Sequence, residues 1–250
     1  MSPKRLLLLS NSTMSGTDYM LWSKQLITKF LTKYNVKNIV FIPFAGVSLD
    51  WEEYEKKVSS ALTEFTVTSI HRTSDYLESI LRSEAIVIGG GNSFHLLYKL
   101  QEFNLIDAIR QRVLNDGVPY VGWSAGANVA TPDIGTTNDM PIIWPKTDSA
   151  LHLVDYNINP HYNEWKPSGH GGETRTDRLN ECLLVKKRPI VAISEGIGIE
   201  VDGDRHTVIA PELQCGDRYV KIWLFNGNND TNIEVINAAF GQDIGPIVSK

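Results

Sequence analysis

Apolar runs of strand length alternate with segments of helical period along the first half of the chain. The strand-like runs lie at residues 5–10, 38–43, 67–71, 85–88 and 118–123. The segments in which apolar residues recur at helical spacing lie between them, at residues 22–34, 50–65, 75–82, 94–100 and 105–114. This βα alternation predicts an α/β fold, doubly wound, with a mostly parallel sheet and helices on both faces.

The second half is less regular. Residues 131–148 contain three prolines and no clear period, which indicates an ordered loop. Further strands are predicted at residues 154–158 and 189–194, a helix at 173–184, and a β-rich C-terminal end with strands at 197–201, 207–209 and 220–225. No repeat or linker divides the chain, so we expect one domain over residues 1–250.

Composition and charge narrow the class of protein. Hydrophobic residues make up 42% and charged residues 21%, as in ordinary globular proteins, and no apolar run has the length of a membrane span. The apolar run Leu6–Leu9 is too short for a signal peptide, so a cytoplasmic protein is expected. The net charge of -5 and the lack of a Lys/Arg cluster argue against nucleic acid or an anionic membrane as partner. An acidic small substrate would therefore need a local cation.

The two cysteines do not form a pattern typical of metal binding. Cys182 and Cys215 are far apart in the sequence and make no C-x-x-C motif, so we expect buried free thiols rather than a zinc site or a disulfide framework. We predict no metal site.

The most informative stretch is the apolar run that leads into Gly122-Trp123-Ser124-Ala125-Gly126. Gly-x-Ser-x-Gly after a strand and before small, helix-compatible residues is typical of a nucleophile elbow, in which the serine occupies a sharp strand-to-helix turn. The N–H of Ala125 would then point towards an oxyanion at the start of the helix. The sequence thus indicates a serine hydrolase.

A second glycine run follows another predicted strand. Gly89-Gly90-Gly91 lets the backbone approach a ligand and present N–H groups to an anion. Gly91 is therefore a candidate for the second oxyanion donor, and Asn92 for a substrate-binding residue.

A nucleophilic serine needs a base and an orienting acid. Of the six histidines, His161 directly follows a predicted strand, and ligands of open α/β sheets lie at the carboxyl ends of strands. The other five are expected to be structural or solvated: His71, His95, His152, His170 and His206.

Two carboxylates are candidates for the acid. Glu195 ends a predicted strand, and Asp139 lies between the serine and the histidine in the chain, as in the α/β-hydrolase order.

Several blocks in one order resemble the peptidase E family of α-aspartyl dipeptidases. They are LLSNST at 8–13, FIPFAGV at 41–47, IGGGN at 88–92, GWSAGAN at 122–128, TTNDMP at 136–141, INPH at 158–161, GETR at 172–175 and EG at 195–196. The resemblance covers at least residues 6–201.

The resemblance implies a fold related to class I glutamine amidotransferases and a cofactor-independent serine peptidase. Its substrates would be dipeptides and some short peptides with an N-terminal aspartate. Carried over by position, Ser124 is the nucleophile, His161 the base, and Gly91 with Ala125 the oxyanion donors. Both Glu195 and Asp139 match acids given the third role. We favour Glu195 because a strand-end carboxylate is held more rigidly, which leaves Asp139 to bind the substrate's amino group.

Specificity for aspartate requires a cationic partner, because a bidentate guanidinium is the best match to a carboxylate. Arg175 in the GETR block is the candidate. The oligomeric state is expected to be a monomer or a small homo-oligomer. Two other functions stay open: a cyanophycinase-like hydrolase of β-aspartyl-arginine, and a non-catalytic module that binds an acidic metabolite.

Overall fold

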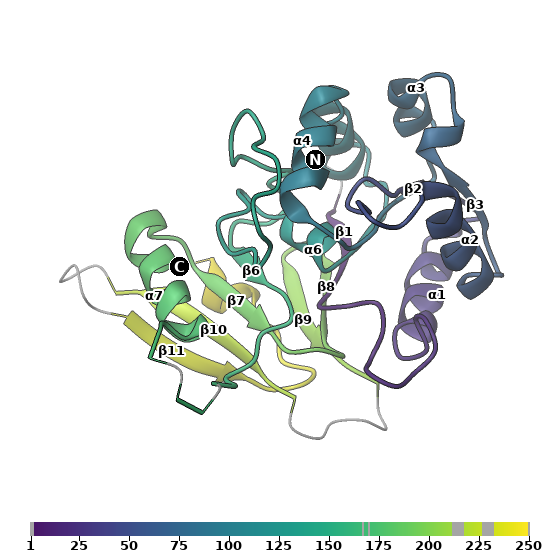
Figure 1. The fold of residues 1–250 in the computed structure, drawn as a ribbon. Coiled ribbons are helices and arrows are strands. Elements are labelled where there is room, and N and C mark those ends of the chain that lie inside the picture. The colour runs from purple at the N-terminus through teal and green to yellow at the C-terminus, as the bar shows by residue number, and fades with distance from the viewer. Residues whose placement is uncertain (1–2, 167, 170, 212–217, 227–232, 250) are drawn as a thin grey trace.

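The computed structural model describes residues 3–166, 168–169, 171–211, 218–226 and 233–249. Its larger sheet has seven strands in the order β3-β2-β4-β5-β1-β8-β9 (Figure 1). Their bounds are β1 Arg5–Leu9, β2 Asn38–Ile42, β3 Thr66–Ser69, β4 Ala85–Ile88, β5 Tyr120–Trp123, β8 Gly198–Asp202 and β9 Arg205–Ile209. The first five are parallel to one another, whereas β8 and β9 are antiparallel to their neighbours.

Strand β1 lies in the interior of this sheet because its side chains are apolar on both faces. Leu6, Leu7, Leu8 and Leu9 are fully buried, with alternate leucines in two separate hydrophobic clusters on opposite faces of the sheet. On one side β1 pairs with β5, and on the other with β8. The strand that leads to Ser124 is therefore directly adjacent to β1.

Helices cover both faces of the larger sheet, as the pattern predicts. The α-helices are α1 Lys24–Lys33, α2 Trp51–Ala61, α3 Tyr76–Leu81, α4 Ser93–Glu102, α5 Ile106–Arg110, α6 Ala125–Asn128, α7 Arg175–Lys186 and α8 Gly245–Val248. A 3-10 helix (η1, Ile70–Arg72) follows β3, and a π-helix (η2, Gln111–Asn115) follows α5.

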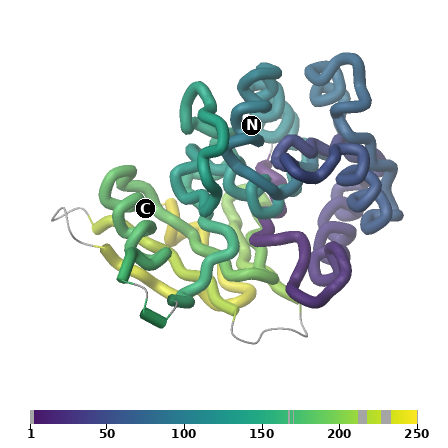
Figure 2. The backbone as a smooth tube through the Cα atoms, viewed as in Figure 1, coloured from purple at the N-terminus to yellow at the C-terminus, as the bar shows by residue number. Residues whose placement is uncertain are grey.

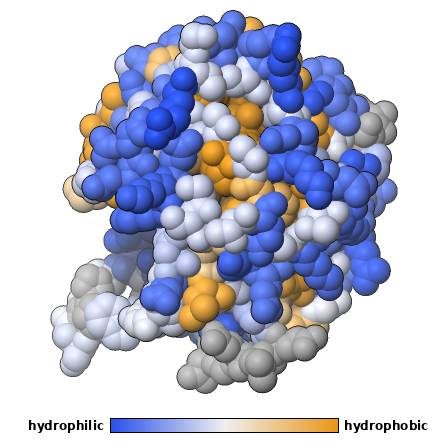
Figure 3. Space-filling model, turned by 90° about the vertical axis from the view of Figure 1, so that its right-hand side faces the viewer, coloured by the Kyte–Doolittle hydropathy of each residue, from blue (hydrophilic) through white to orange (hydrophobic). Residues whose placement is uncertain are grey.

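The helices are amphipathic, as their spacing predicts. Asp50 caps α2, since its carboxylate accepts hydrogen bonds from the N–H groups of Glu52 and Glu53. On the face that Figure 3 shows, apolar groups appear only as patches between hydrophilic side chains. Within the described ranges, no helix combines the length and the apolarity that crossing a bilayer requires.

A second, smaller sheet has the order β11-β10-β7-β6. Its strands are β6 Asn157–Asn159, β7 Ile190–Ile193, β10 Val220–Phe225 and β11 Ile233–Ala238. In Figures 1 and 2 its strands lie in the green and yellow part of the molecule, with α7 beside them, while the purple and blue N-terminal helices lie at the other side. One hydrophobic cluster contains residues of both sheets, such as Leu8 and Val191, so the two sheets share a core.

The α/β class, the parallel sheet and the β-rich C-terminal end are confirmed, but several boundaries are wrong. The strand predicted at 67–71 ends at Ser69, where the 3-10 helix begins, and the helix predicted at 105–114 changes to a π-helix at Gln111. The strand predicted at 154–158 is displaced to Asn157–Asn159. Its apolar residues Val154 and Tyr156 are buried in irregular chain, so burial rather than strand pairing explains their pattern. Strand β11 and helix α8 were not predicted.

The end of β1 joins the two sheets. The fully buried Ser10 hydroxyl donates to the carbonyl of Ile193 in β7 at 3.1 Å and accepts the N–H of His161, after β6, at 2.8 Å. The Ser10 N–H donates to Ile197 O, before β8, at 2.9 Å. One residue thus satisfies polar groups of both sheets where they meet.

We predict that Ser10→Ala lowers the free energy of unfolding by about 1–3 kcal/mol, because it leaves the buried His161 N–H without its partner. The Ile193 carbonyl loses one of its two donors and keeps the N–H of Tyr162 at 3.0 Å. Chemical denaturation measures this loss. Ser12→Ala is the matched control, because Ser12 is only partly buried, so water can replace the contacts of its hydroxyl with Thr13, at 3.3 Å, and Tyr19. Equal stability of the two variants would contradict the role given to Ser10.

Candidate active site

Ser124 occupies the predicted turn between β5 and α6. Its backbone has φ 53° and ψ -114°, a conformation that residues with a side chain rarely adopt. Its N–H donates to the carbonyl of Leu9 in β1 at 3.0 Å, and its carbonyl accepts from Ala127 and Asn128 in the helix that follows. The elbow is therefore held on both sides by backbone hydrogen bonds.

Gly126 shows why the turn requires a small residue at this position. A Cβ on Gly126 would collide with the carbonyl oxygen of Ile88 at the end of β4. The glycine thus lets α6 pack closely against the neighbouring strand. The Gly-x-Ser-x-Gly pattern has a steric cause in this fold.

His161 lies between Ser124 and Glu195. Its Nε2 is 2.8 Å from Ser124 Oγ, and its Nδ1 is 2.9 Å from Glu195 Oε1. For Nε2 to accept the serine proton, Nδ1 must carry the ring proton and donate it to the carboxylate. The three side chains therefore form one hydrogen-bonded chain in the order carboxylate, imidazole, hydroxyl.

His161 and Glu195 follow strands of the smaller sheet, whereas Ser124 follows a strand of the larger one. His161 lies two residues beyond β6 and Glu195 two residues beyond β7, and these strands pair in parallel. His161 also has a positive φ of 54°. The base and the acid of the hydrogen-bonded chain thus face Ser124 across the junction of the two sheets.

Asp139 lies elsewhere. Its Oδ2 accepts the N–H of Ser93, at the start of α4, at 2.7 Å and the Thr137 hydroxyl at 3.0 Å. No hydrogen bond joins it to His161 within the described residues. The carboxylate that the structure brings to the histidine is that of Glu195.

The glycine run after β4 lies beside Ser124. A Cβ on Gly90 would approach Ser124 Cβ to 3.0 Å, and Gly91 has φ 140°, with the space of a Cβ filled by the backbone of Ala45. Within the part of the chain that the structure describes, the N–H groups of Gly91 and Ala125 donate to no protein acceptor. Both remain available for a substrate oxygen.

A cavity of about 600 Å³ opens at Ser124 and His161. Its wall includes the glycine run, Asn92, the segments after β1 and β2, and side chains of α2. Apart from His161, Lys57 of α2 is the one basic side chain among the described residues that line it. This volume is in the range of small-molecule sites.

The side chains of Arg175 and Asn92 bind backbone carbonyl groups at the site. Arg175 is the first residue of α7, after the capping box that Thr174 forms with Asp177, and its Nη1 donates to the carbonyl of His161. Desolvation by partial burial lowers its pKa, and the guanidinium stays charged at neutral pH. Asn92 caps α4 through His95 N and donates to Met140 O at 2.9 Å.

Three cavity or site residues were not predicted to have a role in the site. They are Tyr54, Lys57 and Ser10. Tyr54 is part of the apolar stripe of α2, Lys57 lies in the same helix, and Ser10 follows the apolar strand β1. Ser10 lies in the LLSNST block, which was the only signal for it.

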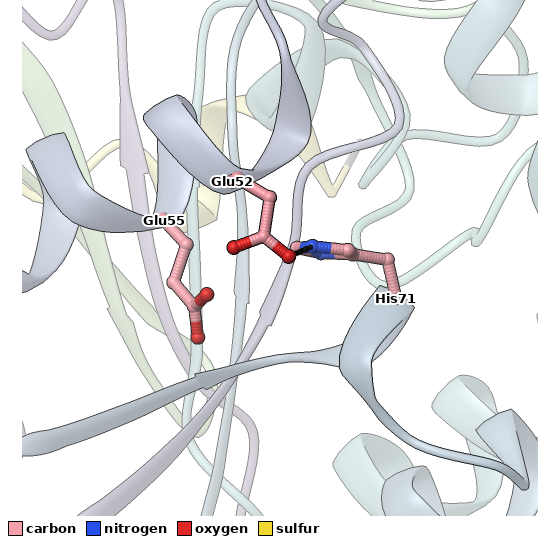
Figure 4. Close-up of side chains that lie close together, drawn as sticks. All are labelled: Glu52, Glu55 and His71. Carbon is pink, nitrogen blue, oxygen red and sulfur yellow. Dashed lines mark hydrogen bonds and ion pairs between the residues drawn. The ribbon is translucent and has the colours of Figure 1, made fainter.

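Outside this cavity lies a cluster of three side chains of the kinds that can bind a metal ion. Glu52, Glu55 and His71 approach one another (Figure 4), with His71 Nε2 3.1 Å from Glu52 Oε1. Arg72 forms ion pairs with both glutamates. Because the guanidinium already supplies the positive charge, this arrangement is a salt-bridge network of α2 and η1.

The remaining predictions on cysteine and histidine have mixed outcomes. Cys182 is a free, partly buried thiol, and burial raises its pKa to about 11. His71 and His95 bond to Ser69 and to the Phe44 carbonyl, and His206 is buried beside Tyr156, which agrees with structural roles. Cys215 and His170 lie outside the described residues.

Known proteins resemble this chain over most of its length. The model of peptidase family S51 matches residues 6–209. Peptidase E of Haemophilus influenzae is 46% identical over 201 residues, which cover 79% of this chain and 92% of the relative. Peptidase E of Actinobacillus pleuropneumoniae is 43% identical over 216 residues, or 85% of this chain and 92% of the relative.

Solved structures share the fold. A peptidase from an acI-B1 actinobacterium superposes with a TM-score of 0.66 at 15% identity, over 96% of this chain and 97% of the other. A Listeria monocytogenes protein assigned as a peptidase E superposes with a TM-score of 0.62 at 24% identity, over 84% and 99%. With an elbow serine, the family model over residues 6–209 and relatives above 40% identity, this chain belongs to the serine peptidases of family S51.

Proposed function

We propose that this protein is a dipeptidase that hydrolyses the peptide bond after an N-terminal aspartate, in dipeptides and some short peptides. The observation that carries the proposal is the hydrogen-bonded chain from Glu195 through His161 to Ser124, of which Ser124 and His161 line a cavity sized for a small peptide. Relatives at 43–46% identity are peptidases E.

The mechanism follows from the atoms that are in contact. His161 Nε2 takes the Ser124 hydroxyl proton while Oγ attacks the aspartyl carbonyl carbon. The N–H groups of Gly91 and Ala125 bind the oxyanion. The C–N bond then breaks as His161 protonates the leaving amine, and water, deprotonated by His161, hydrolyses the aspartyl ester and regenerates Ser124.

Glu195 is assigned as the triad acid. Its contact with Nδ1 holds the imidazole in the tautomer that can accept the serine proton, and it stabilises the imidazolium that forms. Asp139, by contrast, accepts the first N–H of α4 next to Asn92. From the sequence we expected Asp139 to bind the substrate's amino group. We now assign it a structural role, in which it positions the start of α4 beside the site.

Two cations are candidates for the aspartyl carboxylate. Arg175 is our first assignment, since a guanidinium matches a carboxylate in a bidentate manner, and its contact with His161 O places it beside the base. Lys57 is the competitor, because it lines the cavity and has no acidic partner among the described residues. Either cation would make charge-assisted hydrogen bonds that asparagine cannot accept equally well.

The alternative functions have less support. A non-catalytic metabolite-binding module would not need the aligned Glu195, His161 and Ser124 side chains. A cyanophycinase-like polymer hydrolase is disfavoured by the peptidase E relatives.

We predict that Ser124→Ala lowers kcat for Asp-Leu by at least about 10⁴-fold, because alanine lacks the attacking hydroxyl. Steady-state hydrolysis measures the loss, and thermal unfolding verifies that the variant is folded. Turnover near that of the wild type would rule out the serine mechanism.

Replacing each acid by its amide separates their roles. Glu195→Gln is expected to lower kcat by about 10³-fold or more, because the amide can no longer stabilise the imidazolium or fix the tautomer. Asp139→Asn should have a much smaller effect on kcat, since this carboxylate touches Ser93 and Thr137. The opposite ranking in parallel assays would make Asp139 the triad acid.

Arg175→Met is expected to reduce kcat/KM for Asp-Leu by about 10- to 100-fold, the loss of one charge-assisted hydrogen bond of about 1.5–3 kcal/mol. Activity on Asn-Leu should change little, so the preference for aspartate falls. Lys57→Met is the matched comparison. If only Lys57→Met abolishes the preference, the aspartyl carboxylate binds to Lys57 and the assignment to Arg175 is wrong.

A further inference from the structure

The turn that presents Gly91 needs an external support. Three consecutive glycines rotate freely about their backbone bonds, so the turn does not fix its own conformation. Backbone hydrogen bonds hold its two ends: Gly89 N–H donates to Ile42 O at 3.2 Å, and Asn92 N–H donates to Ala45 O at 2.9 Å. Neither bond involves the peptide group between Gly90 and Gly91.

A side chain of α2 holds that peptide. The Tyr54 hydroxyl donates to the carbonyl oxygen of Gly90 at 3.0 Å and accepts the indole N–H of Trp123 at 3.2 Å. Gly90 precedes Gly91, and Trp123 precedes Ser124. One buried hydroxyl therefore connects the residue before the glycine oxyanion donor with the residue before the serine.

Because the peptide bond is planar, the contact of Tyr54 with Gly90 O also affects the N–H of Gly91. The C=O of Gly90 and the N–H of Gly91 belong to one rigid trans peptide and point in opposite directions. The group that holds the carbonyl therefore also sets the direction of the N–H. We propose that Tyr54 is a positioning residue of the oxyanion hole, which fixes the Gly91 N–H relative to Ser124. The inference rests on the serine mechanism proposed above.

The surroundings of Tyr54 keep it in place and protonated. The side chain is 5% exposed, and its ring packs edge-on against Phe41 with centroids 5.0 Å apart. Phe41 in turn stacks on Trp123. Gly89 makes room for the tyrosine, because a Cβ there would collide with the hydroxyl. Burial raises the pKa of Tyr54 to about 12, so the hydroxyl remains a donor at neutral and mildly alkaline pH.

Tyr54→Phe tests the proposal, because it removes the hydroxyl and retains the ring. We expect kcat for Asp-Leu to fall about tenfold or more, with KM within about twofold of the wild type. Loss of a whole oxyanion donor costs about 10²- to 10³-fold in kcat, which sets the upper limit. A rise in KM at constant kcat would overturn the proposal, because Tyr54 would then bind the ground state of the substrate.

Tyr156→Phe is the matched control. Tyr156 is also fully buried, its hydroxyl lies 3.1 Å from His206 Nδ1, and it is not among the described residues that line the cavity. Both variants lose a buried, hydrogen-bonded hydroxyl, with two contacts in Tyr54 and one in Tyr156. A loss of stability is therefore expected in both, while only Tyr54→Phe should lower kcat. Equal kcat values for the two variants would reduce Tyr54 to a purely structural role.

A second readout does not depend on aspartyl specificity. A small fluorophosphonate forms a bond between Ser124 Oγ and phosphorus and releases fluoride, with its phosphoryl oxygen in the oxyanion hole. The rate, followed by mass spectrometry of the intact protein, should fall in Tyr54→Phe and not in Tyr156→Phe. If the wild type reacts with the probe but does not cleave Asp-Leu, the proposed substrate is wrong and Tyr54 is still tested.

A fluorinated tyrosine at position 54 extends the test without removing the side chain. Fluorination lowers the pKa of the phenol, and an ionised oxygen cannot donate to the Gly90 carbonyl. We expect kcat to decline at a lower alkaline pH than in the wild type. Identical pH profiles, with the fluorotyrosine shown by its absorbance to ionise in that range, would overturn the proposal.

Discussion

The arrangement of the site depends on how the end of β1 joins the two sheets. Ser124 and the glycine turn follow strands of the larger sheet, whereas His161 and Glu195 follow strands of the smaller one. No single sheet therefore fixes the distance between the serine and the imidazole. That distance is set at the junction, where the buried Ser10 hydroxyl accepts the His161 N–H.

Three consecutive residues at this junction contact the backbone of Ser124, of His161 and of Gly196, which follows Glu195. Leu9 O accepts the Ser124 N–H at 3.0 Å, Ser10 Oγ accepts the His161 N–H, and Asn11 Oδ1 accepts the N–H of Gly196, next to Glu195, at 2.9 Å. Since β1 is buried on both faces and paired on both edges, its end is a rigid reference. Ser124 and His161 both have positive φ values, a conformation that costs about 1–3 kcal/mol for each residue and persists only where the surroundings impose it.

The sequence was sufficient to predict what depends on local pattern. The apolar runs and helical stripes identified the parallel strands and their helices, and the glycines around Ser124 indicated the elbow, because each reflects a local steric or burial requirement. His161 and Glu195 were found because both follow strands. The second sheet was not foreseen, since strand order depends on long-range pairing. Tyr54 and Ser10 occupied apolar patterns, and a hydroxyl in such a pattern does not reveal its partner.

Tyr54 and Ser10 act on the site in the same physical way. Each is a buried hydroxyl that accepts one N–H and donates to one carbonyl, and each joins two segments that are distant in the sequence. Burial makes such a bridge costly to break, because the freed polar groups cannot reach water. Ser10 thereby fixes the histidine relative to β1, and Tyr54 fixes the glycine turn relative to β5. Strands β1 and β5 are adjacent and parallel. The serine, its base and the oxyanion donors are therefore all positioned relative to the same pair of strands.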